Sequence, residues 1–421
     1  MNMAPQLSTQ CCIAGGGPAG MMLGYLLARA GIDVIVLEKW KDFFRDFRGD
    51  TIHPSTMEGL RALGLLEKFL ALEPDRAETL GGRIGGTEVT VADFRRLPVH
   101  CRFIALIPQW DFLSFLGREA QRYPGFHLHM ETEATDLLIE NGAVCGVSAK
   151  SGGQQSAIRA DLVIGADGRR SIMREKSGLR PKNLGAPIDV LWFRLSRKAS
   201  DPSRPLGVFD RGRFLVMIKR KDYWQCGYVI PKGDFDRICA AGIDRFRGEI
   251  AGLEPELGER MREIESFESV KLLSVVVDRL ADWSREGLLC IGDAAHAMSP
   301  IGGVGINLAI QDAVAAANIL VPAFRRGKPG PADLKAVQRR RQFPTVVTQG
   351  MQLFLQNRVL RTALASRGPA TVPLLLRLAQ HIPALQQIPA RAIGLGVRPE
   401  MPAMQLFTFW RLPKALRAAG R

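Results

Sequence analysis

Residues 11–20 read Cys11-Cys-Ile-Ala-Gly15-Gly-Gly-Pro-Ala-Gly20, and this stretch decides the fold. The apolar residues before Gly15 predict a short buried strand, and the residues after Gly20 have a helical composition up to Gly31. A second apolar stretch at residues 33–37 predicts another buried strand. A glycine-rich turn between a strand and a helix, followed by a second strand, is typical of a βαβ unit that binds a dinucleotide.

The spacing of the glycines fits that function. Gly15 allows a tight turn, Gly17 lets the backbone approach a pyrophosphate, and Gly20 allows the helix to pack closely on the strand. The N-terminus of the helix favours phosphate charge. Glu38 ends the second strand, where a carboxylate can bind an adenosine ribose. The residues predicted to bind the dinucleotide here are Gly15, Gly17, Pro18, Ala19, Gly20, Glu38 and Lys39.

Two further apolar strands end in turns that contain an aspartate. Asp167-Gly168 follows the strand at residues 162–164, and Gly292-Asp293 follows the strand at residues 288–291. A carboxylate just past a strand can bind the hydroxyls of a ribityl chain. The glycine-rich residues 302–305 open a helix whose N-terminus suits the pyrimidine edge of a reduced, anionic flavin. Read alone, each aspartate is an ordinary turn residue.

In this order, the three motifs resemble those of the FAD-dependent aromatic hydroxylases. These are class A flavoprotein monooxygenases related to para-hydroxybenzoate hydroxylase and to the ubiquinone-pathway hydroxylases. The resemblance covers roughly residues 11–320. It implies FAD as the cofactor, NADH or NADPH as a transient co-substrate, and O2. The implied reaction is hydroxylation of an aromatic, phenolic small molecule through a flavin C4a-hydroperoxide.

The resemblance also implies which residues bind the flavin. Arg48 and Gln109 match residues near the phosphates and the ribityl chain, and Ala134 matches a residue that contacts the adenine. Arg48 is otherwise a surface guanidinium, and Gln109 a polar residue at a helix start. The other expected flavin-binding residues are Asp167, Gly168, Gly292, Asp293, Pro300, Gly303, Val304, Gly305, Ile306 and Asn307.

The sequence identifies no catalytic residue, and His53, Tyr223 and Pro300 are the candidates. We interpret His296 as a structural histidine. No cluster has metal-ligand spacing, so no metal is expected. Aromatic residues of the antiparallel region either line a substrate pocket or belong to the core; they are Trp192, Phe193, Phe214, Tyr223, Trp224 and Tyr228.

These features predict an α/β fold with three parts. Residues 1–72, 102–183 and 270–321 are expected to form a discontinuous, Rossmann-like FAD-binding domain. Residues 73–101 and 184–269 are expected to form an interleaved, mainly antiparallel β substrate domain. Residues 322–421 are expected to form a basic helical region whose prolines keep its helices short.

The net charge of +15 has one source. Residues 322–421 hold 17 Lys and Arg residues against Asp333 and Glu400, which accounts for the whole excess. No nucleic-acid-binding motif accompanies this charge, so no nucleic-acid partner is expected. Peripheral contact with an anionic membrane fits the charge, but packing of these helices on the globule is favoured. With no secretory signal and no long uninterrupted apolar stretch, the expected location is the cytoplasm.

Two other functions remain open on the same scaffold. One is a flavin-dependent reductase of an isoprenoid-type substrate, and the other is a flavin-binding module without turnover. A halogenase is disfavoured because its Trp-x-Trp-x-Ile-Pro motif is missing from the sequence.

Overall fold

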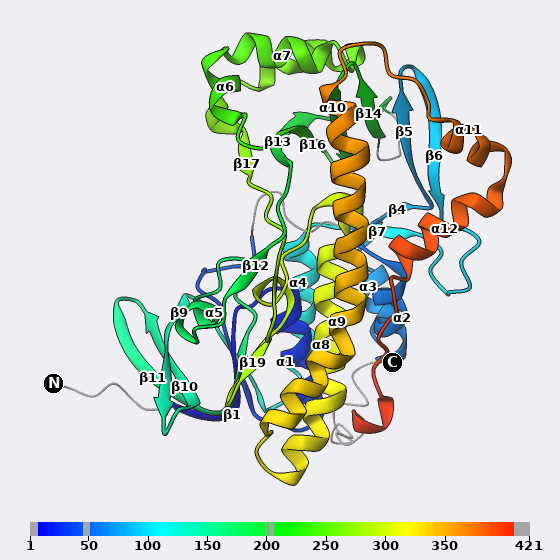
Figure 1. Ribbon diagram of the computed structural model, residues 1–421. Helices are drawn as coiled ribbons and strands as arrows, with labels where there is room; N and C mark the ends of the chain where they lie inside the picture. The colour runs from blue at the N-terminus through cyan, green and yellow to red at the C-terminus, as the bar shows by residue number, and fades with distance from the viewer. Residues whose placement is uncertain (1–6, 45–50, 199, 202–205, 408–421) are drawn as a thin grey trace.

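The computed structural model describes residues 7–44, 51–198, 200–201 and 206–407. Its first layer is a parallel sheet with the strand order β20-β11-β1-β2-β8 (Figure 1). The strands are β1 (Leu7–Ala14), β2 (Val34–Leu37), β8 (Phe126–His129), β11 (Gln154–Gly165) and β20 (Leu288–Cys290), with β19 (Ser284–Arg285) antiparallel at the edge. Because the five strands are parallel, their carboxyl ends share one edge of the sheet.

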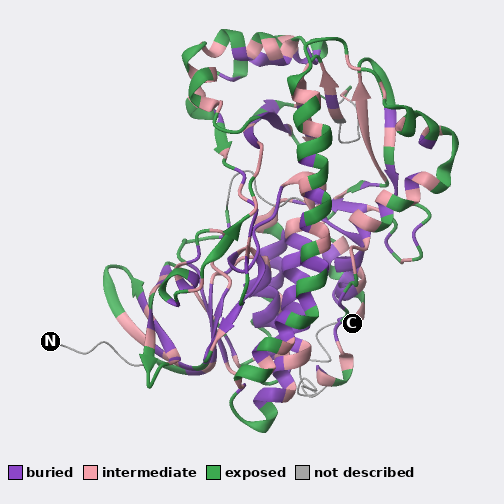
Figure 2. Ribbon diagram, in the orientation of Figure 1, coloured by how far each residue is buried: buried purple, intermediate pink, exposed green. Residues whose placement is uncertain are grey.

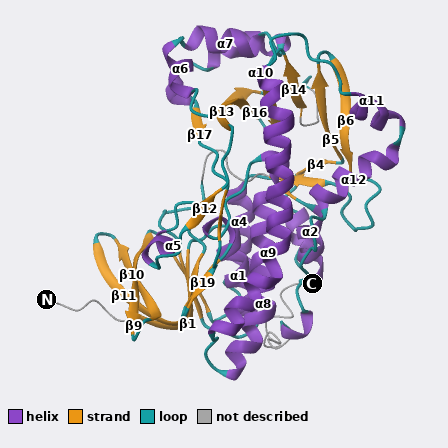
Figure 3. Cartoon of the chain, in the orientation of Figure 1, coloured by secondary structure: helices purple, strands orange, loops and turns teal. Residues whose placement is uncertain are grey.

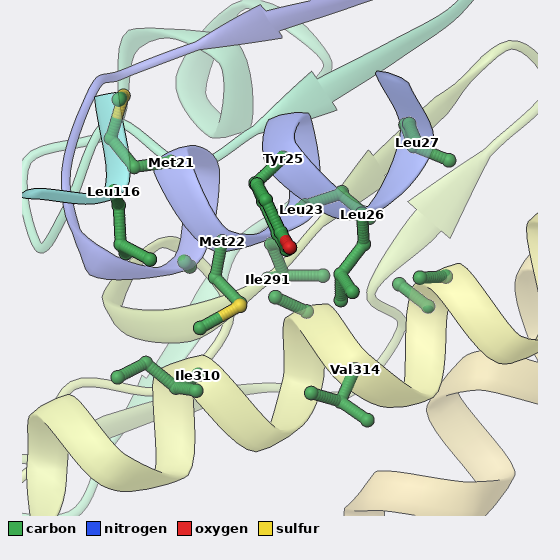
Figure 4. Packing of buried hydrophobic residues seen from close by; sticks show 14 of the residues in the cluster. Met21, Met22, Leu23, Tyr25, Leu26, Leu27, Leu116, Ile291, Ile310 and Val314 are labelled. Carbon is green, nitrogen blue, oxygen red and sulfur yellow. The ribbon is translucent and has the colours of Figure 1, made fainter. Parts of the chain in front are cut away.

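Two apolar helices build the core beside this sheet. Helix α1 (Pro18–Arg29) has ten of its twelve residues buried, and it packs against α8 (Val304–Arg326). Figure 4 shows Met22 and Leu26 of α1 directed toward Ile310 and Val314 of α8. A helix that is apolar on nearly every side is stable only when it is surrounded. The segment Ile301–Arg326 is long and apolar enough to cross a membrane, but 78% of its apolar window is buried inside the protein.

A second sheet lies above the first and is mostly antiparallel, with the order β17-β13-β16-β15-β14-β5-β6. Helices α6 and α7 cover one of its faces. The predicted α/β fold class, with a Rossmann-like sheet and an antiparallel second sheet, is confirmed. The elements of this layer are β5 (Thr79–Ile84), β6 (Thr87–Asp93), β13 (Ile188–Ser196), β14 (Leu206–Asp210), β15 (Arg213–Lys219), β16 (Tyr223–Pro231), β17 (Lys271–Leu273), α6 (Phe235–Ala240) and α7 (Ile243–Ala251).

Short elements connect and flank the two layers. The helices are α2 (Pro54–Ala62), α3 (Leu66–Leu70), α4 (Gln109–Ala120) and α5 (Ile172–Lys176). The strands are β3 (Thr51–Ile52), β4 (Asp75–Ala77), β7 (Ile104–Leu106), β9 (Thr132–Glu140), β10 (Ala143–Ser151), β12 (Pro181–Asn183) and β18 (Asp278–Leu280). Strands β9 and β10 extend the parallel sheet through β11.

The C-terminal region contains one long helix that the sequence did not predict. Helix α9 (Pro331–Phe354), the π-helix η5 (Leu355–Leu360) and α10 (Arg361–Ala365) run without interruption along the front of both layers (Figure 3). The expectation of only short helices is wrong here, since α9 continues through Pro344. Two smaller helices, α11 (Leu374–His381) and α12 (Pro383–Gly394), follow and lie beside β6.

Buried glutamines explain why the long helix persists. Gln349 donates to the carbonyls of Asp278 and Ala297, and Gln352 donates to those of Ser299 and Ile301. These bonds attach the helix to the backbone that precedes α8, so tertiary contacts outweigh the loss of one helical hydrogen bond at Pro344. Helix α9 buries one face, with eight of its 24 residues buried, whereas η5 and α10, at its upper end in Figure 2, are mostly exposed.

Candidate functional site

The motifs predicted from the sequence meet at one edge of the parallel sheet. The glycine turn follows β1, Glu38 follows β2, Asp167-Gly168 follows β11, and Gly292-Asp293 follows β20. These four strands are direct neighbours. In open α/β sheets the ligand-binding crevice lies outside the carboxyl ends of the strands. The structure therefore places the predicted site residues where the fold binds ligands.

The glycine turn leaves space over the N-terminus of α1. Gly15 has a φ of +107°, and a Cβ there would collide with the backbone of Ala166. A Cβ at Gly20 would collide with the carbonyl of Gly15. At Gly17, by contrast, no heavy atom lies within 4 Å of a Cβ position. Helix α1 has neither a side-chain cap nor an acidic residue in its first turn. Its unpaired N–H groups and open space fit a pyrophosphate.

Glu38 is fixed beside this turn. Its Oε2 accepts a hydrogen bond from the Gly16 N–H at 3.2 Å, and its Oε1 accepts one from the Trp40 N–H at 3.1 Å. Lys39 is exposed and lies 3.7 Å from Glu133, and Ala134 is buried in β9. The carboxylate thus stands at the end of β2, where an adenosine ribose would be bound.

Asp167 supports the helix that follows it. Its Oδ2 accepts hydrogen bonds from the N–H groups of Ile172 and Met173 at 2.7 and 3.1 Å. Burial raises its pKa, and the hydrogen bonds to the carboxylate offset this only in part. Ser171 caps the same helix, accepting a hydrogen bond from the Arg174 N–H at 2.9 Å. Asp167 therefore has a structural role in this site, and Gly168, with a φ of +84°, turns the chain.

Arg169 connects the Asp167-Gly168 turn to the Gly292-Asp293 turn. This residue was not identified from the sequence. Its Nε lies 4.0 Å from Oδ2 of Asp293. Gly292 has a φ of +58°, which lets the turn present Asp293 with about a third of its side chain exposed. Gln109 is the first residue of α4, and within the described residues its half-buried side chain makes no hydrogen bond. A carboxylate and an uncommitted amide fit a polyhydroxyl chain.

The N-terminus of α8, like that of α1, can bind negative charge. Gly303 is its N-cap, with a φ of +63°, and the helix has no side-chain cap and no acidic residue in its first turn. Thr51 closes the turn from behind by donating to the Gly303 carbonyl at 3.0 Å. The N–H groups of this first turn belong to Val304, Gly305 and Ile306. They fit the electron-rich pyrimidine edge of a flavin.

Asn307 ties this helix to the segment that contains His53. Its Oδ1 accepts hydrogen bonds from the His53 N–H and from the Thr56 hydroxyl, both at 2.8 Å, and its Nδ2 donates to the Thr51 carbonyl at 3.0 Å. Both polar atoms of the side chain are thus engaged by protein, which gives Asn307 a positioning role. Arg48, just before this segment, lies outside the described residues.

The three candidate catalytic residues have different environments. His53 is fully buried, its Nδ1 lies 2.7 Å from the Ile393 carbonyl, and burial lowers its pKa to about 4. Its Nε2 has no hydrogen-bond partner. Tyr223 has the guanidinium of Arg194 4.8 Å from its ring centre. Pro300 begins the turn before α8. The structure does not bring these three residues into one catalytic cluster by any hydrogen bond.

The structure divides the aromatic residues of the second sheet between its two faces. Phe193, Trp224 and Tyr228 are buried under α7 and belong to the core. Trp192 and Phe214 lie on the other face and pack on the same cluster as Ile301, which directly follows Pro300. Arg220 and Gln225 also occupy this second face by strand parity, and Arg220 donates to Gln225 Oε1 at 3.1 and 3.2 Å. This face is therefore the one turned toward the α8 turn.

A buried charge network lies behind the Gly292 turn. Its two charged members, Asp312 and Arg341, were not identified from the sequence. Asp312 of α8 binds His296, Gly292 and Arg341. The sequence feature that could have indicated this network is the single carboxylate, Asp312, within the apolar residues of α8. Among the described residues, no group of three or more His, Cys, Asp or Glu side chains is arranged to hold a metal ion.

Together, these features define a dinucleotide-binding oxidoreductase fold with a flavin site. The glycine turn and Glu38 fit the adenosine diphosphate half of FAD, and Gln109, Asp293 and the α8 N-terminus fit its flavin half. The site geometry thus agrees with an adenine dinucleotide better than with a mononucleotide flavin.

Comparisons with known proteins identify the family. Residues 8–350 match the family model described as "FAD binding domain". The chain is 33% identical to the 6-methylpretetramide 4-monooxygenase of Streptomyces rimosus over 394 aligned residues. The alignment covers 92% of this chain and 92% of that enzyme. The chain is 28% identical to the digeranylgeranylglycerophospholipid reductase of Methanocella arvoryzae over 75% of this chain and 78% of that one. The solved p-nitrophenol 4-monooxygenase PnpA of Pseudomonas putida has a similar fold, with a TM-score of 0.73, 19% identity, and coverage of 94% and 100%.

The chain therefore belongs to the FAD-binding family of class A flavoprotein monooxygenases. It is an FAD-dependent monooxygenase, of the class that oxidises aromatic compounds. The predicted FAD cofactor is confirmed, and NADH or NADPH is the reductant that this class implies.

Proposed function

We propose that this enzyme uses NADH or NADPH and O2 to hydroxylate a phenolic small molecule. The observation that carries the proposal is the composition of one sheet face. Trp192 and Phe214 give it aromatic surface, Arg220 gives it a buried cation, and Ile301 joins it to the turn that begins α8. A phenol needs both an apolar wall for its ring and a polar group for its oxygen.

Arg220 relates this face to the expected flavin site. Its guanidinium is 3% exposed, and it acts electrostatically on Asp111, two residues beyond Gln109 in α4. Burial raises the pKa of Asp111, and the charges of Arg118 and Arg220 partly oppose that effect.

Each part has a stated role in the proposal. When bound, FAD supplies the reducing power drawn from NADH or NADPH and the activation of O2. Gln109 and Asp293 hold the cofactor's ribityl chain, and Asn307 keeps the α8 turn in place. Trp192 and Phe214 orient the substrate ring, and their apolar surface excludes water. The charge of Arg220 stabilises a phenolate oxygen, which makes the ring more electron-rich.

The similarity to a digeranylgeranylglycerophospholipid reductase supports a second candidate, reduction of an isoprenoid-type chain. The hydroxylase is favoured because the monooxygenase relative has the higher identity, 33% against 28%, and covers more of the chain, 92% against 75%. The two functions consume different co-substrates, since only the hydroxylase requires O2.

The test is NADH and NADPH oxidation by the FAD-loaded enzyme with a panel of phenols. We expect substrate-stimulated oxidation, O2 uptake and a hydroxylated product. Arg220→Gln should lower kcat/KM by about tenfold or more, since a hydrogen bond to a charged group contributes about 1.5–3 kcal/mol. Arg220→Lys should retain more activity, and Arg237→Gln, which changes an exposed arginine of α6 on the opposite side of the sheet, should behave as wild type. Oxidation that no phenol stimulates, or turnover without O2, would reject the proposal.

A further inference from the structure

Residues 334–399, which we term the acid-free segment, contain ten Lys and Arg residues and no Asp or Glu. At its start, three of the four cations are neutralised by the rest of the protein. Lys335 pairs with Asp282, Arg340 pairs with Glu400 at 2.7 Å, and Arg341 pairs with Asp312 at 2.9 Å. These pairs hold α9 on the body of the enzyme.

Further along the segment the charge is not compensated. Six exposed arginines form no ion pair within the described ranges of the chain; they are Arg358, Arg361, Arg367, Arg377, Arg391 and Arg398. The first five lie on η5, on α10, in the loop that follows α10, on α11 and on α12. Of these elements, η5, α10 and α11 are mostly exposed, as Figure 2 shows. The acid-free segment therefore carries positive charge on its exposed side that no ion pair among the described residues compensates.

The same region exposes large apolar side chains. Leu374 and Leu375 of α11 are 70% and 72% exposed. Leu378 follows Leu374 at an interval of four residues and is also exposed, so the two share one helix face. Ile382, just past the end of α11, is 47% exposed. Arg377 lies on the same exposed side. Ile388 of α12 is 66% exposed. Apolar side chains grouped in this way on a surface indicate an interaction site.

Helix α11 is held firmly with this face outward. The Gln380 side chain accepts a hydrogen bond from the Thr90 N–H at 2.9 Å and donates one to the Thr90 carbonyl at 3.0 Å. It thereby pairs with the free edge of β6, the last strand of the sheet. Ala379 is buried, and Ala390 of α12 joins the cluster that contains Phe94 and Ile104. The inner face is thus used for docking, and the leucines remain on the outer face.

We infer that α11 and its surroundings bind the surface of an anionic lipid bilayer. Leucines that enter the acyl boundary and arginines that contact acidic headgroups are the two components of such binding. A second copy of this chain is a poor occupant because two surfaces with uncompensated arginines repel each other. Nucleic acid is a poor occupant because leucines offer no stacking surface to bases. The inference does not depend on the substrate.

The test is flotation of the full-length, FAD-loaded enzyme with vesicles of phosphatidylcholine and phosphatidylglycerol, and with vesicles of phosphatidylcholine alone. We expect binding to the phosphatidylglycerol vesicles at low salt, weakened by high salt, and little binding to neutral vesicles. Leu374→Gln/Leu375→Gln should weaken partitioning by about tenfold or more because each buried leucine contributes about 1.5–3 kcal/mol. Arg377→Gln should weaken it about fivefold, equivalent to about 1 kcal/mol.

Ile139→Gln is the matched control, since Ile139 is 46% exposed on β9 in the FAD-binding layer. It should bind vesicles as wild type does, and all variants should keep their FAD content. Failure of the wild type to float with anionic vesicles at low salt would overturn the inference, as would unchanged flotation of the double leucine variant. Binding to an acidic protein without binding to vesicles, or a leucine-dependent dimer, would also overturn it.

Discussion

Nε2 of His296 lies 2.6 Å from Oδ2 of Asp312, and both side chains are buried. The same carboxylate accepts hydrogen bonds from the Gly292 N–H at 3.1 Å and from Nε of Arg341 at 2.9 Å. Burial alone would raise the pKa of Asp312, but His296 and Arg341 together bring it below its ordinary value. One carboxylate therefore joins the turn after β20 to both long helices.

We expect Asp312→Asn to destabilise the enzyme by about 3 kcal/mol, because it removes the nearer of the two carboxylates beside the buried Arg341 and leaves only Glu400, at 3.8 Å. FAD should also bind more weakly, since Gly292 precedes Asp293. Urea unfolding and FAD titration measure the two effects. Asp282→Asn, which breaks an exposed pair with Lys335, should cost less than about 1 kcal/mol. Equal effects of the two variants would show that the buried network has no special role.

Gly17→Ala separates FAD binding from folding. The backbone of Gly17, with a φ of −74°, suits alanine, and no protein atom lies within 4 Å of the new Cβ. Stability should stay the same or rise by about 0.4–1 kcal/mol. The Cβ occupies the space expected for the pyrophosphate, so FAD affinity should fall about tenfold, equivalent to about 1.4 kcal/mol.

Gly350→Ala in α9 is the control for Gly17→Ala, because its Cβ position is equally open. It should raise stability by about 0.5–1 kcal/mol and leave FAD affinity unchanged. Unchanged FAD affinity of Gly17→Ala would place the pyrophosphate elsewhere.

His53 should make the stability depend on pH. Its pKa is about 4 in the folded protein and about 6.5 when unfolded, so only the unfolded chain binds a proton between these values. Stability should therefore be fully present above pH about 6.5 and fall by about 1.4 kcal/mol per unit as the pH drops toward 4. His53→Gln should reduce this slope, measured by urea unfolding across the range. The exposed His127 serves as the control position, and a slope that His127→Gln reduces equally would contradict the assignment.

Gln352→Leu tests how the long helix supports the turn before α8. The Gln352 side chain accepts a hydrogen bond from the Ser299 N–H and donates to the carbonyls of Ser299 and Ile301. Leaving such groups buried and unpaired should cost about 1–3 kcal/mol. The bound-flavin absorption spectrum should also change. Gln342→Leu, an exposed glutamine on the same helix, should leave both stability and spectrum unchanged.

The FAD-binding layer could be predicted from the sequence because its signals are local. The glycine turn, Glu38 and the two aspartate turns each follow an apolar strand, and parallel strands bring their carboxyl ends together. The apolar run within residues 213–219, which forms β15, and the serine that precedes α5 are local features of the same kind.

The rest depends on contacts between distant residues. Asp312 and Arg341 are 29 positions apart, and nothing in either local sequence predicts their pairing. The continuous helix through Pro344 depends on glutamines that bind backbone more than 50 residues away. Which aromatic residues face the site depends on the register of β13 and β16, which alternation alone does not settle.

The most direct test of the account is mass spectrometry of products formed by the FAD-loaded enzyme under isotopically labelled O2, with NADH or NADPH and a phenol that stimulates oxidation. The account predicts a product heavier than the substrate by one oxygen atom, and that atom carries the label. A product without the label, or a phenol recovered unchanged while the reductant is consumed, would contradict it.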